Sequence, residues 1–254
     1  MTRGLYTAYT GMLAQQKKMD TISNNLANVN TTGYKKDGVV FESFKEVYMV
    51  KINDPEQPGV QKIGKGSLGV KTGEIYTDFS LGPVQETDNP LNMALDTAGM
   101  FAVGSYDKEG NLIEKYTRDG SFGLNAQGQI VTNEGLFLLG ENGPITVSNN
   151  HIRISDKGII FDGSTRVDQI KVVNFEDLST LKKITGDLYE SSQQSQTKPY
   201  EGLIAQGFIE GSNVSSIDEM INMINVMRTY ETNQKVITTY DETMSKAVNE
   251  VGRL

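Results

Sequence analysis

The stretch that decides the fold is SSIDEMINMINVMRTYETNQKVITTYDETMSKAVNEV, residues 215–251. It opens with Ser215 or Ser216 as a helix cap, because a serine oxygen can accept from the unpaired N–H groups of a first turn. Asp218 and Glu219 fall in that turn, where carboxylates suit the positive end of the helix dipole. A long helix is therefore predicted to begin here and to run toward the C-terminus.

Along this helix, large apolar side chains recur in a seven-residue repeat, which is typical of helices that pack on partner helices. Gln234 and Asp241 interrupt the repeat, and polar residues at such positions fix register and partner number at a cost in stability. We expect a coiled-coil-like seam that packs on partner helices. Its predicted apolar members are Met220, Met223, Met227, Tyr230, Ile237, Met244, Val248 and Val251.

The N-terminal residues 5–26 also carry side chains at spacings of four and three, which predicts a second amphipathic helix. Its predicted seam positions are Leu5, Tyr9, Met12, Gln16, Met19, Ser23 and Leu26, with Leu13 and Ile22 widening the stripe. Residues 1–40 hold five basic and two acidic side chains, whereas residues 210–254 hold four basic and seven acidic ones. The two ends are thus electrostatically complementary, although apolar burial must supply most of their affinity.

Between the helices, glycine-containing dipeptides separate short β-prone runs at intervals of mostly seven or eight residues, which is typical of hairpins. The predicted turns are Asp119-Gly120, Gln127-Gly128, Glu134-Gly135, Asn142-Gly143, Lys157-Gly158 and Asp162-Gly163. The predicted strands include 129–132, 151–154 and 169–173, in which apolar residues alternate or cluster. Residues 53–74 hold Pro55, Pro58 and five glycines, which favours a flexible connector or an extended arm.

The sequence therefore predicts an α+β fold, with a β-rich central domain and terminal helices that form a coiled-coil-like inner domain. The expected divisions are a helical inner domain (1–34 plus 214–254), a connector (35–74), a β-rich outer domain (75–205) and a return link (206–213).

Composition argues against most enzyme and nucleic-acid functions. A formal charge of −8 gives no global attraction for nucleic acid, and the absence of Cys with a lone His151 removes thiolate chemistry and multi-His zinc sites. Residues 59–65 approach the phosphate-binding pattern G-x-x-x-x-G-K, but Gly66 replaces the Ser or Thr that holds Mg²⁺, and no helix-forming segment follows. We expect no catalytic residue, no metal and no cofactor.

The first residues lack the basic start and apolar run of a secretory signal, so a chain that leaves the cytoplasm is expected to use another route. No window approaches the roughly 18 to 20 apolar residues that span a bilayer, so no membrane span is expected.

Several stretches along the chain form recognisable motifs. At the N-terminus these are GLYTA (4–8), Gln15-Gln16 and SNNLANVNTTGYK (23–35). Further along the chain they are NPLNMA (89–94), GMFAV (99–103), YTRDGSF (116–122) and GFIEGSNV (207–214). Together these stretches resemble the flagellar rod and hook subunits, and we take as family signature residues Asn24, Asn25, Leu26, Ala27, Asn28, Gly33 and Tyr34.

The resemblance implies a structural axial subunit of the bacterial flagellar basal body. It would be exported by the flagellar type III apparatus without a cleavable signal, and its partners would be copies of itself and other rod or hook subunits. Whether the chain occupies the proximal rod, the distal rod or a related position stays open. Two rival interpretations are a nucleotide-binding enzyme using the Lys65 loop and a secreted β-domain adhesin with helical ends.

Overall fold

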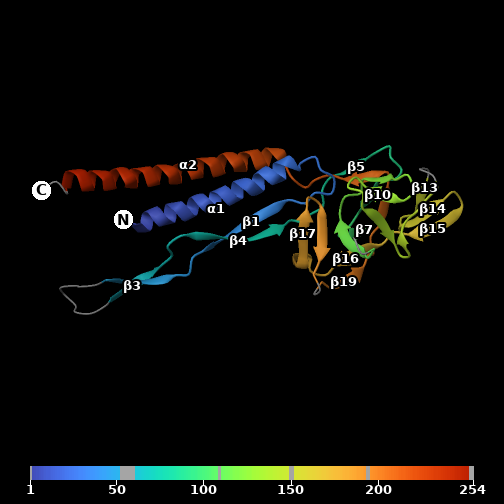
Figure 1. Ribbon diagram of the computed structural model, residues 1–254, viewed down its shortest axis with the longest axis horizontal. Coiled ribbons are helices and arrows are strands. Elements are labelled where there is room, and N and C mark those ends of the chain that lie inside the picture. The colour runs from blue at the N-terminus through green and yellow to red at the C-terminus, as the bar shows by residue number, and fades with distance from the viewer. Residues whose placement is uncertain (1, 52–60, 108–109, 149–151, 193–194, 252–254) are drawn as a thin grey trace. The chain divides into compact units, whose positions relative to one another are not determined.

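The computed structural model describes residues 2–51, 61–107, 110–148, 152–192 and 195–251. The chain forms two compact units. The first contains Met1–Leu26, Asp37–Tyr76 and Ser216–Leu254, and the second contains Ala27–Lys36 and Thr77–Ser215. The helices α1 and α2 and a number of the strands are labelled in Figure 1.

The first unit contains both predicted helices, α1 (Thr2–Ala27) and α2 (Ser216–Lys246), and α2 continues into a π-helical turn, η2 (Ala247–Val251). The two helices lie side by side and antiparallel (Figure 1). Gly4 of α1 lies against the ring of Tyr240, and Gly11, further along α1, lies against the side chain of the earlier α2 residue Asn233. A Cβ at Gly4 would collide with the Tyr240 ring. Small residues on α1 therefore make room for larger side chains on α2.

A narrow two-stranded arm completes this unit. Its outer part pairs β2 (Val47–Lys51) with β3 (Gln61–Gly66), and its inner part pairs β1 (Asp37–Ser43) with β4 (Val70–Thr77). The arm contacts α1, since the Thr7 hydroxyl donates to the carbonyl of Leu68 over 3.2 Å. The described part of the segment predicted to be a connector or extended arm is thus largely β structure.

The second unit is β-rich, as predicted. Its largest sheet runs β17-β18-β8-β7-β11-β10-β9, with β12, β16 and β19 attached beside this path. A three-stranded sheet has the order β13-β14-β15, and the short pairs β20-β6 and β21-β5 join the C-terminal end of the unit to its beginning. The described strand pairs of this unit are all antiparallel.

The strands of this unit have the following bounds. They are β5 (Val84–Glu86), β6 (Met93–Leu95), β7 (Met100–Tyr106), β8 (Leu112–Thr117), β9 (Phe122–Leu124), β10 (Ile130–Thr132), β11 (Phe137–Gly140), β12 (Gly143–Pro144), β13 (Ile152–Ile154), β14 (Ile159–Asp162), β15 (Thr165–Gln169), β16 (Val172–Phe175), β17 (Leu181–Thr185), β18 (Leu188–Ser191), β19 (Thr197–Pro199), β20 (Ile204–Gln206) and β21 (Phe208–Glu210). A short 3₁₀ helix, η1 (Leu178–Thr180), precedes β17.

Most of the predicted glycine turns are confirmed, because the glycine has the positive φ that side-chain-bearing residues avoid. These are Gly128, Gly135, Gly143, Gly158 and Gly163. The prediction for Asp119-Gly120 was wrong: β8 and β9, on either side of it, are not neighbours in the sheet. Asp119 and Gly120 are instead buried, and the carbonyl of Gly120 accepts from the amide of Met93 over 3.0 Å.

The hydrophobic core of the second unit lies along β7 and β11, where Phe101, Val103 and Leu138 have no exposed surface. Phe101 meets Phe122 edge to face at 5.4 Å between ring centres, the geometry that aromatic quadrupoles favour. A second cluster surrounds Tyr116 and Phe175 on the other side of the sheet. These two clusters fix the positions of the strands and loops that pack against them.

Candidate functional site

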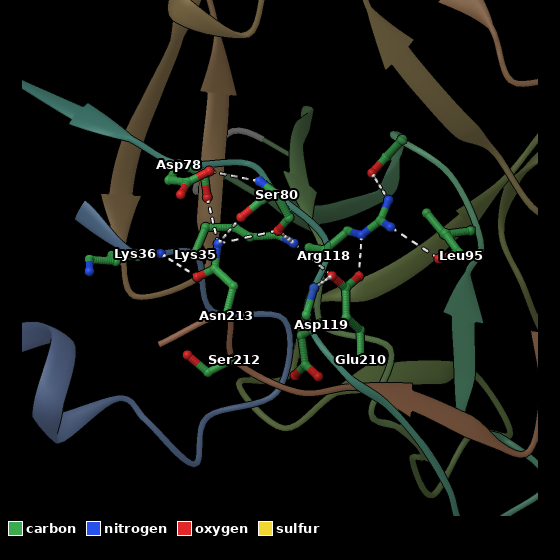
Figure 2. Close-up of polar contacts among 12 residues, drawn as sticks. Lys35, Lys36, Asp78, Ser80, Leu95, Arg118, Asp119, Glu210, Ser212 and Asn213 are labelled. Atoms are coloured by element: carbon green, nitrogen blue, oxygen red, sulfur yellow. Dashed lines mark hydrogen bonds and ion pairs between the residues drawn. The ribbon is translucent and has the colours of Figure 1, made fainter. Parts of the chain in front are cut away.

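Three charged side chains meet in the interior of the second unit. The carboxylate of Glu210 lies 2.6 Å from Lys35 Nζ and 2.5 Å from Arg118 Nε, and all three side chains are only 2 to 3% exposed. Arg118 also donates to the carbonyl of Leu95 (Figure 2) and to those of Thr97 and Gly99. We call Lys35, Arg118 and Glu210 the charge triad.

The charge triad joins segments that are remote in sequence. Lys35 follows the first helix, Arg118 follows β8, and Glu210 ends β21, shortly before the second helix. The Glu210 carboxylate also accepts from the amide of Gly82 at 2.8 Å, and its backbone carbonyl accepts from Gly33 at 2.8 Å. Glu210 therefore ties four separate stretches of the second unit together.

Burial and pairing act against each other in the triad. Burial lowers the pKa of Lys35, and the hydrogen bond and charge of Glu210 only partly oppose that shift. For Glu210, burial raises the pKa, but the charges of Arg118 and Lys35 with their hydrogen bonds outweigh it, so that the pKa is lowered. The carboxylate is thus held ionised, and its removal would leave two buried cations without a counter-charge.

Beside the triad, Asp119 links the family signature segment to the sheet. Its carboxylate accepts from the Thr32 hydroxyl and from the Ser121 amide. Burial, opposed by these hydrogen bonds and reinforced by Asp187 and Glu134, raises the pKa of Asp119 to about 6. Burial also raises the pKa of Asp187, which accepts from the Thr117 hydroxyl.

The signature residues have distinct structural tasks. In the first unit, the side chain of Asn25 is buried and forms two hydrogen bonds with the backbone of Asp37, at 2.9 and 3.0 Å, which fixes the first residue of the arm to the last turns of α1. Asn24 and Ala27 are exposed, whereas Leu26 and Asn28 are half-buried. Signature membership alone therefore does not separate packing residues from surface residues.

In the second unit, Gly33 has φ +68, and a Cβ there would collide with the backbone of Arg118 and Asp119. Tyr34 is buried, with Lys183 Nζ 4.1 Å from the centre of its ring, a cation–π contact. Lys183 also donates to the carbonyl of Lys35. The segment that follows the first helix is thus locked into the β unit on several sides.

The predicted seam of α1 is only partly covered. Leu5 and Tyr9 are exposed, while Met12, Met19 and Leu26 are half-buried. The buried residues of α1 are Ala8, Thr10, Ala14, Thr21, Ile22 and Asn25, and of these only Ile22 belongs to the predicted stripe. Leu5, Tyr6, Tyr9 and Leu13 together form an uncovered apolar patch, which we call the α1 patch.

On α2 the covered stripe is displaced by one position from part of the predicted seam. The buried and half-buried residues in a regular heptad pattern are Glu219, Met223, Val226, Tyr230, Asn233, Ile237 and Tyr240. Met223, Tyr230 and Ile237 belong to both sets, whereas Met220, Met227, Met244 and Val248 are exposed, and Val251 ends the π-helical turn. The exposed apolar residues Ile217, Met220, Ile221, Ile224 and Met227 form what we call the α2 patch.

The structure gives little support to chemistry at the other candidate residues. Gln61–Gly66 of the phosphate-loop-like pattern form the strand β3, which pairs with β2 rather than leading into a helix. His151 lies outside the described residues. Within the described ranges, no group of three or more His, Asp or Glu side chains is placed to hold a metal ion, and no helix is long and apolar enough to cross a membrane.

The charge triad is what sequence reasoning missed. Each of its residues lies inside a stretch that resembles the rod and hook subunits, which was the available signal, but nothing in the pattern marks a charge as buried.

Comparison with known proteins matches three parts of the chain to flagellar families. Residues 5–35 match the family described as flagella basal body rod protein, and residues 94–161 match the flagellar hook protein FlgE/F/G D1 domain. Residues 205–250 match the flagellar basal body rod FlgEFG protein C-terminal family.

Relatives extend this match to nearly the whole chain. The flagellar basal-body rod protein FlgG of Buchnera aphidicola subsp. Schizaphis graminum is 36% identical, over 97% of this chain and 98% of its own length. The flagellar hook-basal body complex protein FlhO of Bacillus subtilis is 32% identical, and the flagellar basal-body rod protein FlgF of Caulobacter vibrioides is 30% identical, each over 100% of both chains.

The family matches and the relatives define a class, a structural protein of the flagellum that is not an enzyme. Within that class, the chain belongs to the flagellar basal-body rod protein family. Its identity to the FlgG, FlhO and FlgF relatives lies between 30 and 36%.

Proposed function

We propose that this chain polymerises, with copies of itself and other rod or hook subunits, through the α1 and α2 patches to form part of the torque-transmitting shaft of the flagellar basal body. The observation that carries the proposal is the large apolar surface that each helix leaves uncovered. Ile217 is 67% exposed, and Tyr6, Tyr9, Ile221 and Ile224 are all more than half exposed.

Apolar side chains gathered on one face are what assembly interfaces use, because their burial supplies most of the free energy of association. Leu5, Tyr9 and Leu13 follow at spacings of four on α1, and Ile217, Ile221 and Ile224 at spacings of four and three on α2. Each helix therefore offers a continuous face, in addition to the face it uses inside the first unit. The coiled-coil character predicted for the seam belongs to this assembled state.

In the assembled shaft, we assign residues 1–34 and 214–254 to an inner helical layer and residues 75–205 to an outer β layer, with 35–74 as connector and 206–213 as return link. The seam positions predicted from the sequence are proposed contacts, and those that belong to the two patches are the first among them.

The proposed route to the basal body is export by the flagellar type III apparatus, followed by assembly within the cell envelope. Two features of the chain favour it. The sequence has no Cys that could mispair on entering an oxidising compartment. The helices have incomplete packing in a single chain, which favours coupling between final folding and assembly.

The test is a charge placed in the α2 patch. Met227→Asp should abolish polymer formation by the purified protein, seen by sedimentation and electron microscopy, and should abolish motility in complemented cells, because burying an unpaired carboxylate is costly. Asn225→Asp is the matched control, since Asp218, Asn225 and Thr232 follow at seven-residue spacing on a polar, exposed face. Normal motility with Met227→Asp would refute the proposal.

A further inference from the structure

The last segment of the second unit, residues 204–214, is woven through its interior. Ile204 is buried in the main core, and β20 and β21 pair with β6 and β5 from the start of the unit. The Gln206 side chain alone donates to the carbonyls of Pro90 and Ile152 and accepts from the amide of Ile154. We call residues 204–214 the closing segment.

Backbone groups of the upstream chain depend on the same segment. The amides of Gly33 and Thr87 donate to the carbonyls of Glu210 and Gly207, while Gly207 and Gly211 donate to the carbonyls of Asn92 and Pro83. Among the described strands, β6 pairs only with β20, and β5 pairs only with β21. Detaching the segment would therefore leave several buried polar groups unpaired, at a cost of about 1 to 3 kcal/mol each.

The charge triad adds a larger penalty. Without Glu210, Lys35 and Arg118 would face each other as buried cations, and Arg118 would keep only carbonyl partners. Asn213 contributes on the same side, accepting from the Lys36 amide and donating to the carbonyls of Asp78 and Ser80 (Figure 2). These contacts hold Asn213 next to Lys36, the last residue of the unit's first stretch.

We propose that the closing segment is an obligatory strap of the β unit, meaning that the unit does not keep its fold while the segment is detached. Glu210 is the lock of this strap, meaning the residue whose charge holds the segment in place. Because chains are synthesised from the N-terminus, the upstream residues of the unit complete their fold only after Glu210 has been synthesised. The inference concerns only the second unit, so it can fail or hold independently of the proposed polymerisation.

The test is native-state hydrogen exchange on the full chain. If the strap is obligatory, the amides that report on it (Thr87 and Gly211) open only together with amides of the distant core (Ile130 and Ile145), because one global event exposes both sets. Glu210→Gln should then accelerate both sets by the same factor, from about 100-fold to a few thousand-fold, as expected when one partner of a buried ion pair is lost.

Matched variants separate the lock from a general loss of charge. Glu176→Gln removes the carboxylate of an exposed ion pair with Lys198 and should change neither set. Lys35→Met combined with Glu210→Gln restores the original net charge of the triad and should recover part of the protection. If Glu210→Gln does not fold at all, Asn213→Ala provides a milder perturbation, expected to accelerate both sets about 5- to 30-fold.

The decisive comparison is between the two sets of amides. Fast exchange of Thr87 and Gly211 while Ile130 and Ile145 stay protected, in the parent or in any variant, would overturn the proposal, because the core would then persist with the strap open. Equal acceleration of both sets supports it.

Discussion

Replacing Gly33 by Ala tests whether the signature segment is fixed against the backbone of the β unit. Gly33 has φ +68, a conformation that costs an L-residue about 1 to 2 kcal/mol. Its new Cβ would also collide with backbone atoms of Arg118 and Asp119, which cannot rotate away as a side chain could. Overpacking of this kind costs a further 1 to 3 kcal/mol or so. The expected loss of unfolding free energy is therefore about 2 to 5 kcal/mol.

Two other glycines of the same unit separate these effects. Gly163 has φ +62 with nothing within 4 Å of an added Cβ, so Gly163→Ala should cost only the conformational part, about 1 to 2 kcal/mol. Gly123 lies in β9 without a positive φ and also has open space around it. Gly123→Ala should stabilise the unit by about 0.4 to 1 kcal/mol, since it reduces the entropy of the unfolded chain.

The assay is urea unfolding followed by tyrosine fluorescence, because the chain has no Trp and Tyr116 and Tyr189 are buried in this unit. The midpoints at constant slope give the three free-energy changes. If Gly33→Ala costs no more than Gly163→Ala, the close approach of the signature segment to Arg118 and Asp119 does not constrain the fold, and the reasoning is refuted.

Two further predictions concern single polar contacts. The pKa of Asp119, raised by burial from 3.8 to about 6, means that the folded state holds a proton more tightly than the unfolded state; its contribution is fully present below pH 3.8 and is lost as pH rises through 6. Between pH 4 and 7, the free energy of unfolding obtained from urea titrations should therefore fall less in Asp119→Asn than in the parent, by up to about 3 kcal/mol. An unchanged pH profile would contradict the assignment. Asn25→Ala should cost the first unit about 1 to 3 kcal/mol and accelerate exchange of the Asp37 amide, whereas Asn24→Ala, at an exposed neighbouring position, should leave that amide unchanged.

Local patterns in the sequence were enough to predict the two helices and most of the turns. Helix α2 begins at Ser216, within the predicted cap, because the capping and first-turn charge signals act within a few residues. Gly158 and Gly163 mark turns because their φ values exclude most other residues. The run 169–173 was less regular than predicted, since β15 ends at Gln169 and β16 begins at Val172.

Nonlocal contacts could not be predicted in this way. Lys35, Arg118 and Glu210 are far apart in the sequence and have no shared periodicity, and isolated charges in a sequence are usually solvated. The Asp119-Gly120 turn failed for a related reason. The dipeptide Asp-Gly favours a hairpin, but here tertiary contacts decide its role. Asp119 supplies a carboxylate that accepts from Thr32, and Gly120 lies so close to the backbone of Met93 that a side chain would not fit.

The register of α2 shows how a heptad pattern can be correct and still incomplete. Met223, Tyr230 and Ile237 lie on the boundary shared by two stripes, one completed by Val226 and Asn233 and the other by Met220 and Met227. The predicted seam follows the second stripe, whose members are more apolar. In the single chain it is the first stripe that is covered, and its Asn233 and Tyr240 side chains contact glycines of α1. A polar and bulky stripe suits an internal contact with small residues, and the more apolar stripe is left exposed. That division is what a helix needs if it must pair within its own chain and still offer an apolar face to a neighbour.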